Sequence, residues 1–180
     1  VPVLYDEYND SMELWNTRQH YRGWLPVGPW PRSNLASGKP ASQSSTYSSA
    51  DASRAVDGNT DGNWFNGSVS HTNNDPGAWW QVDLGNGQAV EYPIESVSIW
   101  NRTDAAPERL ANYVVQVYDK NGALTWTSPT QAGVAGLPST VPVGRTGRTL
   151  RIQLLGTNYL SLAEVEVWKD PRINLALGKS

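Results

Sequence analysis

Short segments of alternating apolar and polar residues, each followed by a turn signal, succeed one another along most of this chain. Successive side chains of a β-strand point to opposite faces, so the alternation predicts strands with one buried and one exposed face. We expect strands at residues 79–84, 94–100, 113–118, 123–127, 148–155 and 162–168. Because no helical period intervenes, the sequence predicts an all-β fold, an antiparallel β-sandwich of jelly-roll type with about eight main strands.

The composition agrees with this prediction and excludes several classes of protein. The chain has 16 Gly and 12 Pro and only 17% charged residues, which favours a turn-rich β protein over a helical one. Its net charge is −3 without a basic stripe, so we expect no nucleic-acid partner. Cysteine is absent, which excludes disulfides, thiolate catalysis and sulfur-based zinc sites. No run of about 18 apolar residues is present, so we expect no membrane insertion.

The sequence changes character at residue 32. Residues 1–32 contain four prolines and no sustained alternation, and we interpret them as an N-terminal segment or the remnant of a preceding module. The phrase SNLASGK at residues 33–39 recurs near the C-terminus as INLALGK, with five matching positions. A repeat period of one domain length indicates tandem copies. We therefore expect one domain at residues 33–169, the start of a following repeat at 170–180, and further domains in the same chain.

The choice of aromatic residues points to sugars, and the acidic residues do not point to catalysis. The chain has nine Trp and eight Tyr but a single Phe. Trp and Tyr combine a broad ring face with a polar group, as sugar sites and wet interfaces require, although many of them could simply fill the core. Glycosidases need paired carboxylates, and neither a nucleophile elbow nor a metal-hydrolase motif is present. We expect a non-catalytic domain; an enzyme elsewhere in a longer chain stays open as an alternative.

Several phrases together resemble the discoidin or coagulation-factor type C group of β-sandwich domains, and within it the F-type lectins, or fucolectins. They are NLASGKPASQSSTY, RAVDGNTDGNW, WWQVDLG, IESVSIWNR and a closing AEVEVW. The most specific part is His71 followed by Arg102-Thr103-Asp104 and Arg109, which reproduces the family's R-x-D-x4-R/K motif. The resemblance implies a discoidin-like domain that recognises terminal L-fucose on fucosylated glycans.

The resemblance also implies which residues bind the sugar. His71, Arg102 and Arg109 would hydrogen-bond its hydroxyl groups, and Asp104 would orient the arginines. This agrees with their chemistry, because an arginine offers a fixed fork of donors and a neutral histidine can donate or accept. Taken singly, each of these residues could equally be an ordinary solvated group on the surface.

Apolar contacts to the sugar are expected from a second group of residues. Phe65 or Trp64 would cover the methyl group of fucose. Many family members have adjacent cysteines within the motif, where this chain has Ala105 and Ala106. The apolar platform is therefore expected to be smaller, with a possible change in affinity or anomer preference.

A structural calcium ion is the second expectation that comes from the resemblance. Calcium takes six to eight oxygen ligands, including carboxylates, hydroxyls and backbone carbonyls. Asp57 and Glu164 would supply carboxylates and Ser68 a hydroxyl, and three further residues would contribute carbonyls: Arg54, Asn59 and Ala163. The alternative is that AVDGNTDG forms a plain Asp-Gly/Asn turn.

Other ligands remain open for a domain of this type. Discoidin-like modules also bind galactose-type glycans, proteins and lipid surfaces. The loops of this chain hold mainly Ser, Asn, Thr and Gly, which favours a sugar over a lipid. Since fucosylated glycans and abundant calcium are found outside cells, we expect an extracellular location, secreted or at a cell surface. The lack of cysteine favours a bacterial source.

Overall fold

The structure, a computed structural model, describes residues 3–6, 11–15, 22–26 and 32–170. Its contacts separate a first unit of residues 1–32 from a second unit that begins at Ser33. In the first unit, three strands form an antiparallel sheet in the order β1 (Val3–Asp6), β2 (Ser11–Trp15) and β3 (Arg22–Pro26). The sequence did not predict these strands, because residues 1–32 show no sustained alternation. The repeat expected at residues 170–180 lies almost entirely outside the described residues.

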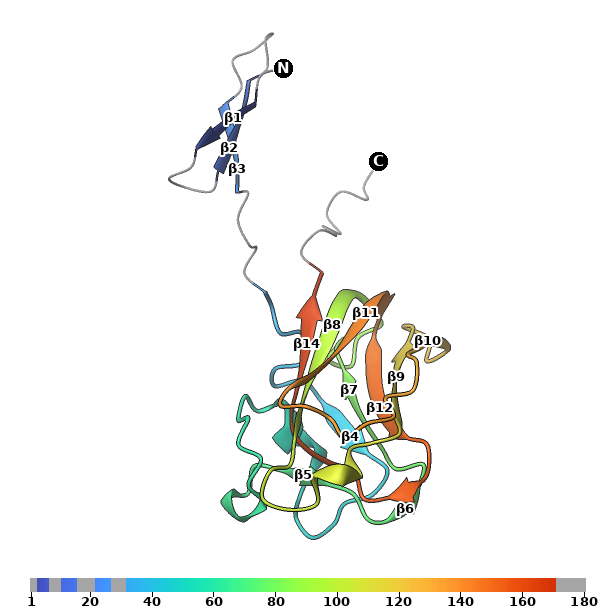
Figure 1. The fold of residues 1–180 in the computed structure, drawn as a ribbon. Helices are drawn as coiled ribbons and strands as arrows, with labels where there is room; N and C mark the ends of the chain where they lie inside the picture. The colour runs from blue at the N-terminus through green and yellow to red at the C-terminus, as the bar shows by residue number, and fades with distance from the viewer. Residues whose placement is uncertain (1–2, 7–10, 16–21, 27–31, 171–180) are drawn as a thin grey trace. The chain divides into compact units, whose positions relative to one another are not determined.

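The second unit is built from two antiparallel sheets that share one core (Figure 1). The larger sheet has the order β10 (Leu124–Thr127), β9 (Tyr113–Tyr118), β12 (Thr149–Leu154), β7 (Trp79–Asp83) and β4 (Ala41–Gln43). The other sheet has the order β11 (Ser139–Gly147), β8 (Tyr92–Asn101), β14 (Ser161–Lys169) and β5 (Ser70–His71). A small pair joins β13 (Thr157–Asn158) to β6 (Asp75–Pro76). The predicted antiparallel sandwich is confirmed.

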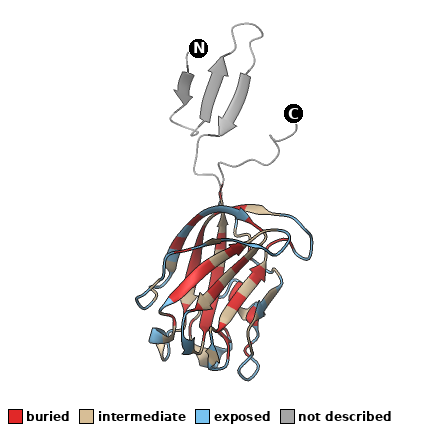
Figure 2. Cartoon of the chain, turned by 90° about the vertical axis from the view of Figure 1, so that its right-hand side faces the viewer, coloured by how far each residue is buried: buried red, intermediate tan, exposed pale blue. Residues whose placement is uncertain are grey.

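The apolar residues that alternate along the strands point inward and form the core. On β12, Leu150, Ile152 and Leu154 point inward while the residues between them are half-exposed. The residues predicted to face inward on β8, namely Ile94, Val97 and Ile99, are at most 1% exposed. Figure 2 shows the buried residues along the strands and the exposed ones mainly on the connecting loops. The apolar face of each sheet is thereby removed from water, which is the main stabilising contribution in a fold of this kind.

The predicted number of strands was wrong, since the second unit has eleven rather than about eight. Five strands lie outside the six ranges predicted from the sequence, and four of them, β4, β5, β6 and β13, have only two or three residues, which is too short to show alternation. The fifth, β11, contains Pro142 and Gly144, and its register with β8 shifts between Pro142 and Arg145. Proline and glycine are typical of loops, and a register shift interrupts the period of two, so this long strand gave no clear signal.

Three short 3₁₀ helices lie in the loops between strands: η1 (Ala52–Val56), η2 (Trp64–Asn66) and η3 (Pro107–Arg109). The buried indole of Trp80 on β7 fixes η1 by donating a hydrogen bond to the Ala52 carbonyl at 2.9 Å. Within the described residues, no helix has the length and apolar character needed to cross a membrane. The loops that carry η2 and η3 approach β5, and there they form a pocket.

Candidate functional site

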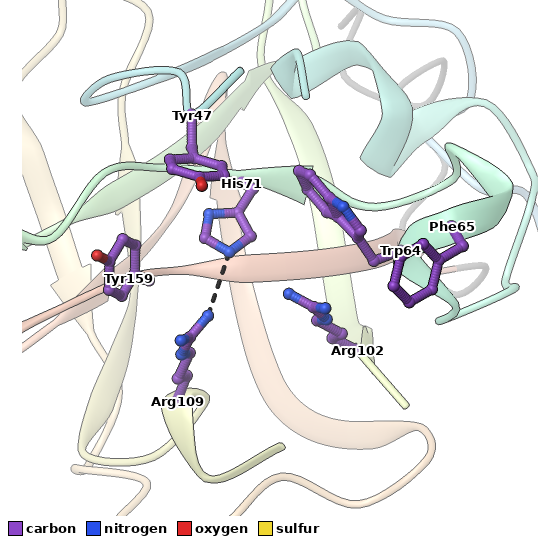
Figure 3. Close-up of a pocket in the computed structure, with 7 residues that line it drawn as sticks. All are labelled: Tyr47, Trp64, Phe65, His71, Arg102, Arg109 and Tyr159. Carbon is purple, nitrogen blue, oxygen red and sulfur yellow. Dashed lines mark hydrogen bonds between the residues drawn. The ribbon is translucent and has the colours of Figure 1, made fainter. Parts of the chain in front are cut away.

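A pocket of about 330 Å³ lies beside β5, and seven side chains line it (Figure 3). Five of them were predicted from the sequence: Trp64, Phe65, His71, Arg102 and Arg109. Of the other two, Tyr47 ends the phrase NLASGKPASQSSTY but was assigned no role in the site, and Tyr159 belongs to no motif that the sequence revealed. The pocket therefore collects residues from η2, from β5, from the loop after β8 that ends in η3, and from two further loops.

His71 forms the floor of the pocket and is only 3% exposed. Its Nδ1 lies 2.6 Å from the Thr72 carbonyl oxygen, which can only accept, so Nδ1 carries the proton. Nε2 is then free to accept, and Nη1 of Arg109 lies 3.3 Å from it. Burial lowers the pKa of His71, and the nearby charges of Arg109 and Arg102 lower it further. The imidazole is thus neutral at pH 7, with its accepting nitrogen directed toward the arginine.

Arg102 is held by Asp104 through two hydrogen bonds. Its Nε and Nη2 lie 2.8 Å from Oδ1 and Oδ2 of the carboxylate. The same Oδ1 accepts the backbone N–H of Trp64 at 3.1 Å, so Asp104 connects the loop of residues 102–109 to η2. The hydrogen bond from Arg102 holds the pKa of Asp104 well below its usual range. The structure places Asp104 against Arg102 and not against Arg109.

The segment between the two arginines is a tight loop with its own supports. The Asn101 side chain donates to the Pro107 carbonyl at 2.9 Å and accepts the Arg102 N–H at 2.8 Å. Ala106, which precedes η3, has left-handed backbone angles of φ 51° and ψ 46°. Neither Ala106 nor the exposed Ala105 lines the pocket, so the structure does not bring these two predicted residues into the site.

The loop before β5 is shaped by a series of four Asx turns. In each, a side-chain oxygen accepts the backbone N–H two residues ahead, and the four acceptors are Asp57, Asn59, Asp61 and Asn63. The series ends at η2, where the Trp64 ring meets the His71 ring edge-on at 5.2 Å. Phe65 is 85% exposed and forms the outer rim. Local side-chain hydrogen bonds therefore fix the position of this aromatic wall.

Two of the residues predicted to bind calcium, Asp57 and Glu164, lie close enough to interact. Glu164 is buried. This side chain is 1% exposed, its Oε1 accepts the Gly58 N–H at 3.2 Å, and its Oε2 has no partner among the described residues. Burial and the neighbouring charge of Asp57 raise its pKa to about 8. Ser68, also buried, donates its hydroxyl to the Asp61 carbonyl. A buried carboxylate oxygen without a partner, beside a second carboxylate, fits a hard divalent cation.

The remaining predicted calcium ligands lie on three different elements. Arg54 lies in η1, Asn59 lies in the Asx series, and Ala163 lies where the register of β14 with β8 shifts. The described part of the chain contains no group of three or more His, Cys, Asp or Glu side chains arranged for a metal. A cation here would therefore need hydroxyl and backbone carbonyl oxygens to complete its coordination.

Comparison with known proteins adds the following matches. A family model described as a NedA-like, galactose-binding domain matches residues 54–152. Fucolectin-6 of Anguilla japonica is 38% identical over 120 residues, which are 64% of this chain and 62% of that relative. The chain thus spans less than two thirds of its length. Fucolectin of Anguilla anguilla is 30% identical over 158 residues, 81% of this chain and 96% of that protein.

A solved structure agrees with these sequence matches. A fucose binding module of Streptococcus pneumoniae superimposes with a TM-score of 0.72 at 36% identity, covering 79% of this chain and 99% of that one. The range matched by the family model contains five of the seven pocket residues, and Tyr47 and Tyr159 fall outside it.

Proposed function

The chain belongs to the fucolectin family within the F5/F8 type C domains, and from that premise we propose that its pocket binds terminal L-fucose of fucosylated glycans. The observation that carries the proposal is the convergence of two arginines and several aromatic faces on one pocket of about 330 Å³. That volume lies at the lower end of the range for ligand pockets and suits a single sugar ring.

The pocket offers partners both for the hydroxyl groups of fucose and for its apolar C–H and methyl groups. No hydrogen bond within the described residues engages Nη1 of Arg102, which leaves this group to donate to a sugar hydroxyl. Arg109 presents a second fork of donors beside it. The rings of Trp64 and Phe65 offer apolar faces for the C–H groups and the methyl at carbon 6. Hydrogen bonds fix the orientation of the sugar, and the aromatic wall favours a methyl over a hydroxymethyl group.

We further propose that Asp57, Ser68 and Glu164 hold a calcium ion that is structural and does not touch the sugar. When bound, the ion would neutralise the buried carboxylate of Glu164 and fix the loop from residue 57 to residue 68. The Asx series supports this role, because it runs without a gap from Asp57 to the backbone N–H of Phe65. Arg54, Asn59 and Ala163 would complete the coordination through carbonyl oxygens.

The proposal places the protein among binding domains and not among enzymes. The relatives that it matches are named as lectins and as a binding module. Its partners would be fucosylated glycans, and its location extracellular, where such glycans are displayed. Galactose shares the axial 4-hydroxyl of fucose, but its 6-hydroxyl would meet the apolar wall of Trp64 and Phe65 and remain without a partner.

Calorimetric titration tests the proposed ligand. In millimolar calcium, L-fucose should give saturable heat with a binding free energy of about −5 to −7 kcal/mol, and D-galactose should give none at the same concentration. Equal heats with both sugars would favour the broader galactose-type specificity of discoidin-like modules. The absence of binding heat with both sugars would refute the proposed function.

Substitution of the arginines tests the proposed site. Arg102→Ala and Arg109→Ala should each weaken fucose binding at least tenfold, because each removes charge-assisted hydrogen bonds worth about 1.5–3 kcal/mol. The matched control is Arg151→Ala, which removes an arginine that stacks on Trp79 and Tyr118 outside the pocket. Its affinity should equal that of the wild type. Full binding by both pocket variants would place the sugar elsewhere.

A further inference from the structure

The two pocket arginines are held in different ways. The Nε and Nη2 groups of Arg102 both donate hydrogen bonds to the carboxylate of Asp104. No carboxylate among the described residues forms an ion pair with Arg109. Its contacts are the Nε2 of His71, at 3.3 Å, and the ring of Tyr159, over which the guanidinium carbon lies 4.5 Å from the centroid. The guanidinium of Arg102 also lies over a ring, that of Trp64, at 5.3 Å from the centroid, but it has the carboxylate of Asp104 in addition. Among the described residues, Arg109 has its aromatic contact without a carboxylate beside it.

Tyr159 is well placed to supply a fixed face. It lies between β13 and β14, and its backbone N–H donates to the Asn158 side chain at 2.8 Å. The next residue, Leu160, is buried, and its N–H and C=O are both hydrogen-bonded to Thr72, the neighbour of His71. The ring itself meets that of His71 at 5.4 Å. The backbone that carries Tyr159 is thus tied to the strand that carries the pocket floor.

An aromatic face and a carboxylate differ in how many N–H groups of an arginine they occupy. A carboxylate takes N–H groups of the guanidinium, as Asp104 takes two from Arg102. A ring holds the guanidinium plane from one side through the cation–π attraction and takes none. Arg109 therefore keeps its N–H groups, apart from the one directed to His71, for a ligand. Figure 3 shows Tyr159 and Arg109 on the same side of the pocket, with His71 between them and Trp64.

From this arrangement we propose that Tyr159 is a positioning residue, which orients Arg109 for hydrogen bonding to the sugar through its ring face and not through its hydroxyl. The inference rests on the proposed fucose site. No hydrogen bond among the described residues engages the Tyr159 hydroxyl, so the ring alone carries the effect. Phenylalanine should replace tyrosine at this position without loss, whereas an aliphatic residue of similar size should not.

The experiment compares Tyr159→Phe and Tyr159→Leu in titrations with L-fucose. Tyr159→Phe should bind within about twofold of the wild type, and Tyr159→Leu roughly tenfold more weakly, in the range expected for a lost cation–π contact. The matched control is Tyr118→Leu, which removes the same kind of contact between a tyrosine ring and Arg151 outside the pocket. It should leave fucose affinity unchanged, although both leucine variants lose an aromatic ring.

A measurement without sugar separates this inference from the proposed function. The side-chain Nε–Hε resonance of Arg109 should be displaced by the ring current in the wild type and in Tyr159→Phe, and should move toward the position of an unstacked arginine in Tyr159→Leu. The inference is overturned if that resonance is the same in all three proteins. It is also overturned if Tyr159→Phe binds as weakly as Tyr159→Leu, or if Tyr118→Leu weakens fucose binding as much.

Discussion

Ala106 adopts a left-handed backbone with φ 51° immediately before Pro107, and it separates the two arginines of the site. An L-residue with a Cβ pays about 1–2 kcal/mol for this conformation, and glycine does not. Ala106→Gly should therefore raise the free energy of unfolding by about 0.5 kcal/mol, after the larger entropy of the unfolded glycine is subtracted. Ala105→Gly is the control, because Ala105 has no positive φ and should lose stability instead. Urea denaturation measures both, and a loss in both variants would contradict the expectation.

His71 predicts how fucose binding depends on pH. Its pKa lies below the ordinary value of about 6.5 because of burial, so the imidazole stays neutral and accepting through that pH. Fucose affinity should therefore persist to a lower pH than a histidine with an ordinary pKa would allow, and should fall at still lower pH, when a protonated ring would face two arginines. The free energy of unfolding depends on pH in the same direction. The stability that the folded protein gains from a neutral His71 is fully present above the unfolded-state pKa of about 6.5, and it is lost as the pH falls through the lowered folded-state pKa. Titrations in a pH series test this, and a loss already complete at pH 6.5 would contradict it.

Single residues of the site were predictable where a motif carries them. His71, Arg102 and Arg109 occur in a spaced pattern, and the structure brings all three into one pocket. Tyr47 and Tyr159 enter the pocket through hydrogen bonds to residues far along the chain, namely Tyr47 to His71 and Leu160 to Thr72. Such contacts depend on strand pairing, which a local pattern does not contain. Tyr47 ends one of the family phrases, NLASGKPASQSSTY, whereas the only sequence signal for Tyr159 is the general abundance of tyrosine.

At the scale of elements, the strands with regular alternation were predictable and the irregular ones were not. The predicted 113–118 strand agrees with β9, and the predicted 162–168 strand lies within β14. The register shift on β14 between Leu162 and Glu164 was not predictable, because a bulge breaks the period of two. It is nevertheless important, since it precedes the buried Glu164 side chain. Bulges of this kind commonly redirect a side chain next to a functional site.

The loop with the four Asx turns, residues 57–65, packs closely against the segment of residues 101–103. One added methyl group at Gly62 is enough to test this contact. A Cβ on Gly62 would lie 2.6 Å from the Asn101 carbonyl oxygen and 2.8 Å from the Thr103 nitrogen. Gly62→Ala should therefore force the two loops apart, with a loss of about 2 kcal/mol of stability and weaker fucose binding. Gly133→Ala is the control, because nothing lies within 4 Å of its Cβ position. Thermal melts and titrations would measure both, and equal behaviour of the two variants would refute the close contact.

For the whole molecule, the fold class followed from the sequence because buried faces impose a period of two on the strands. The pairing order of the sheets did not, since neighbours such as β14 and β5 lie about 90 residues apart, as in the pair Ser161 and His71. The residues proposed to bind calcium show the same limit. Asp57 and Glu164 could be chosen only through the family resemblance, because nothing in the local sequence indicates that the two meet.

Calcium removal should affect stability and binding together if the proposed ion is structural. Millimolar calcium should raise the Tm, and a chelator should lower both the Tm and the affinity for L-fucose, because an ion that binds only the folded state stabilises it. Glu164→Gln should remove most of the calcium-dependent shift. Glu166→Gln is the control on the same strand, since Glu166 accepts the Trp100 indole N–H and should leave the shift intact. Equal melting curves with calcium and with chelator would contradict the structural role.

The two ends of the sandwich domain meet, since Lys169 donates its N–H to the Ser33 carbonyl at 3.0 Å and Asn34 forms a bridge with Trp168. This junction lies at the last residues of β14, whereas His71 pairs with Ser161, the first residue of the same strand. Eight residue steps along a strand span about 26 Å. A graft of the domain into a surface loop of an unrelated host would therefore need only two adjacent attachment points, and the pocket that contains His71 would lie at the opposite end of β14 from the graft.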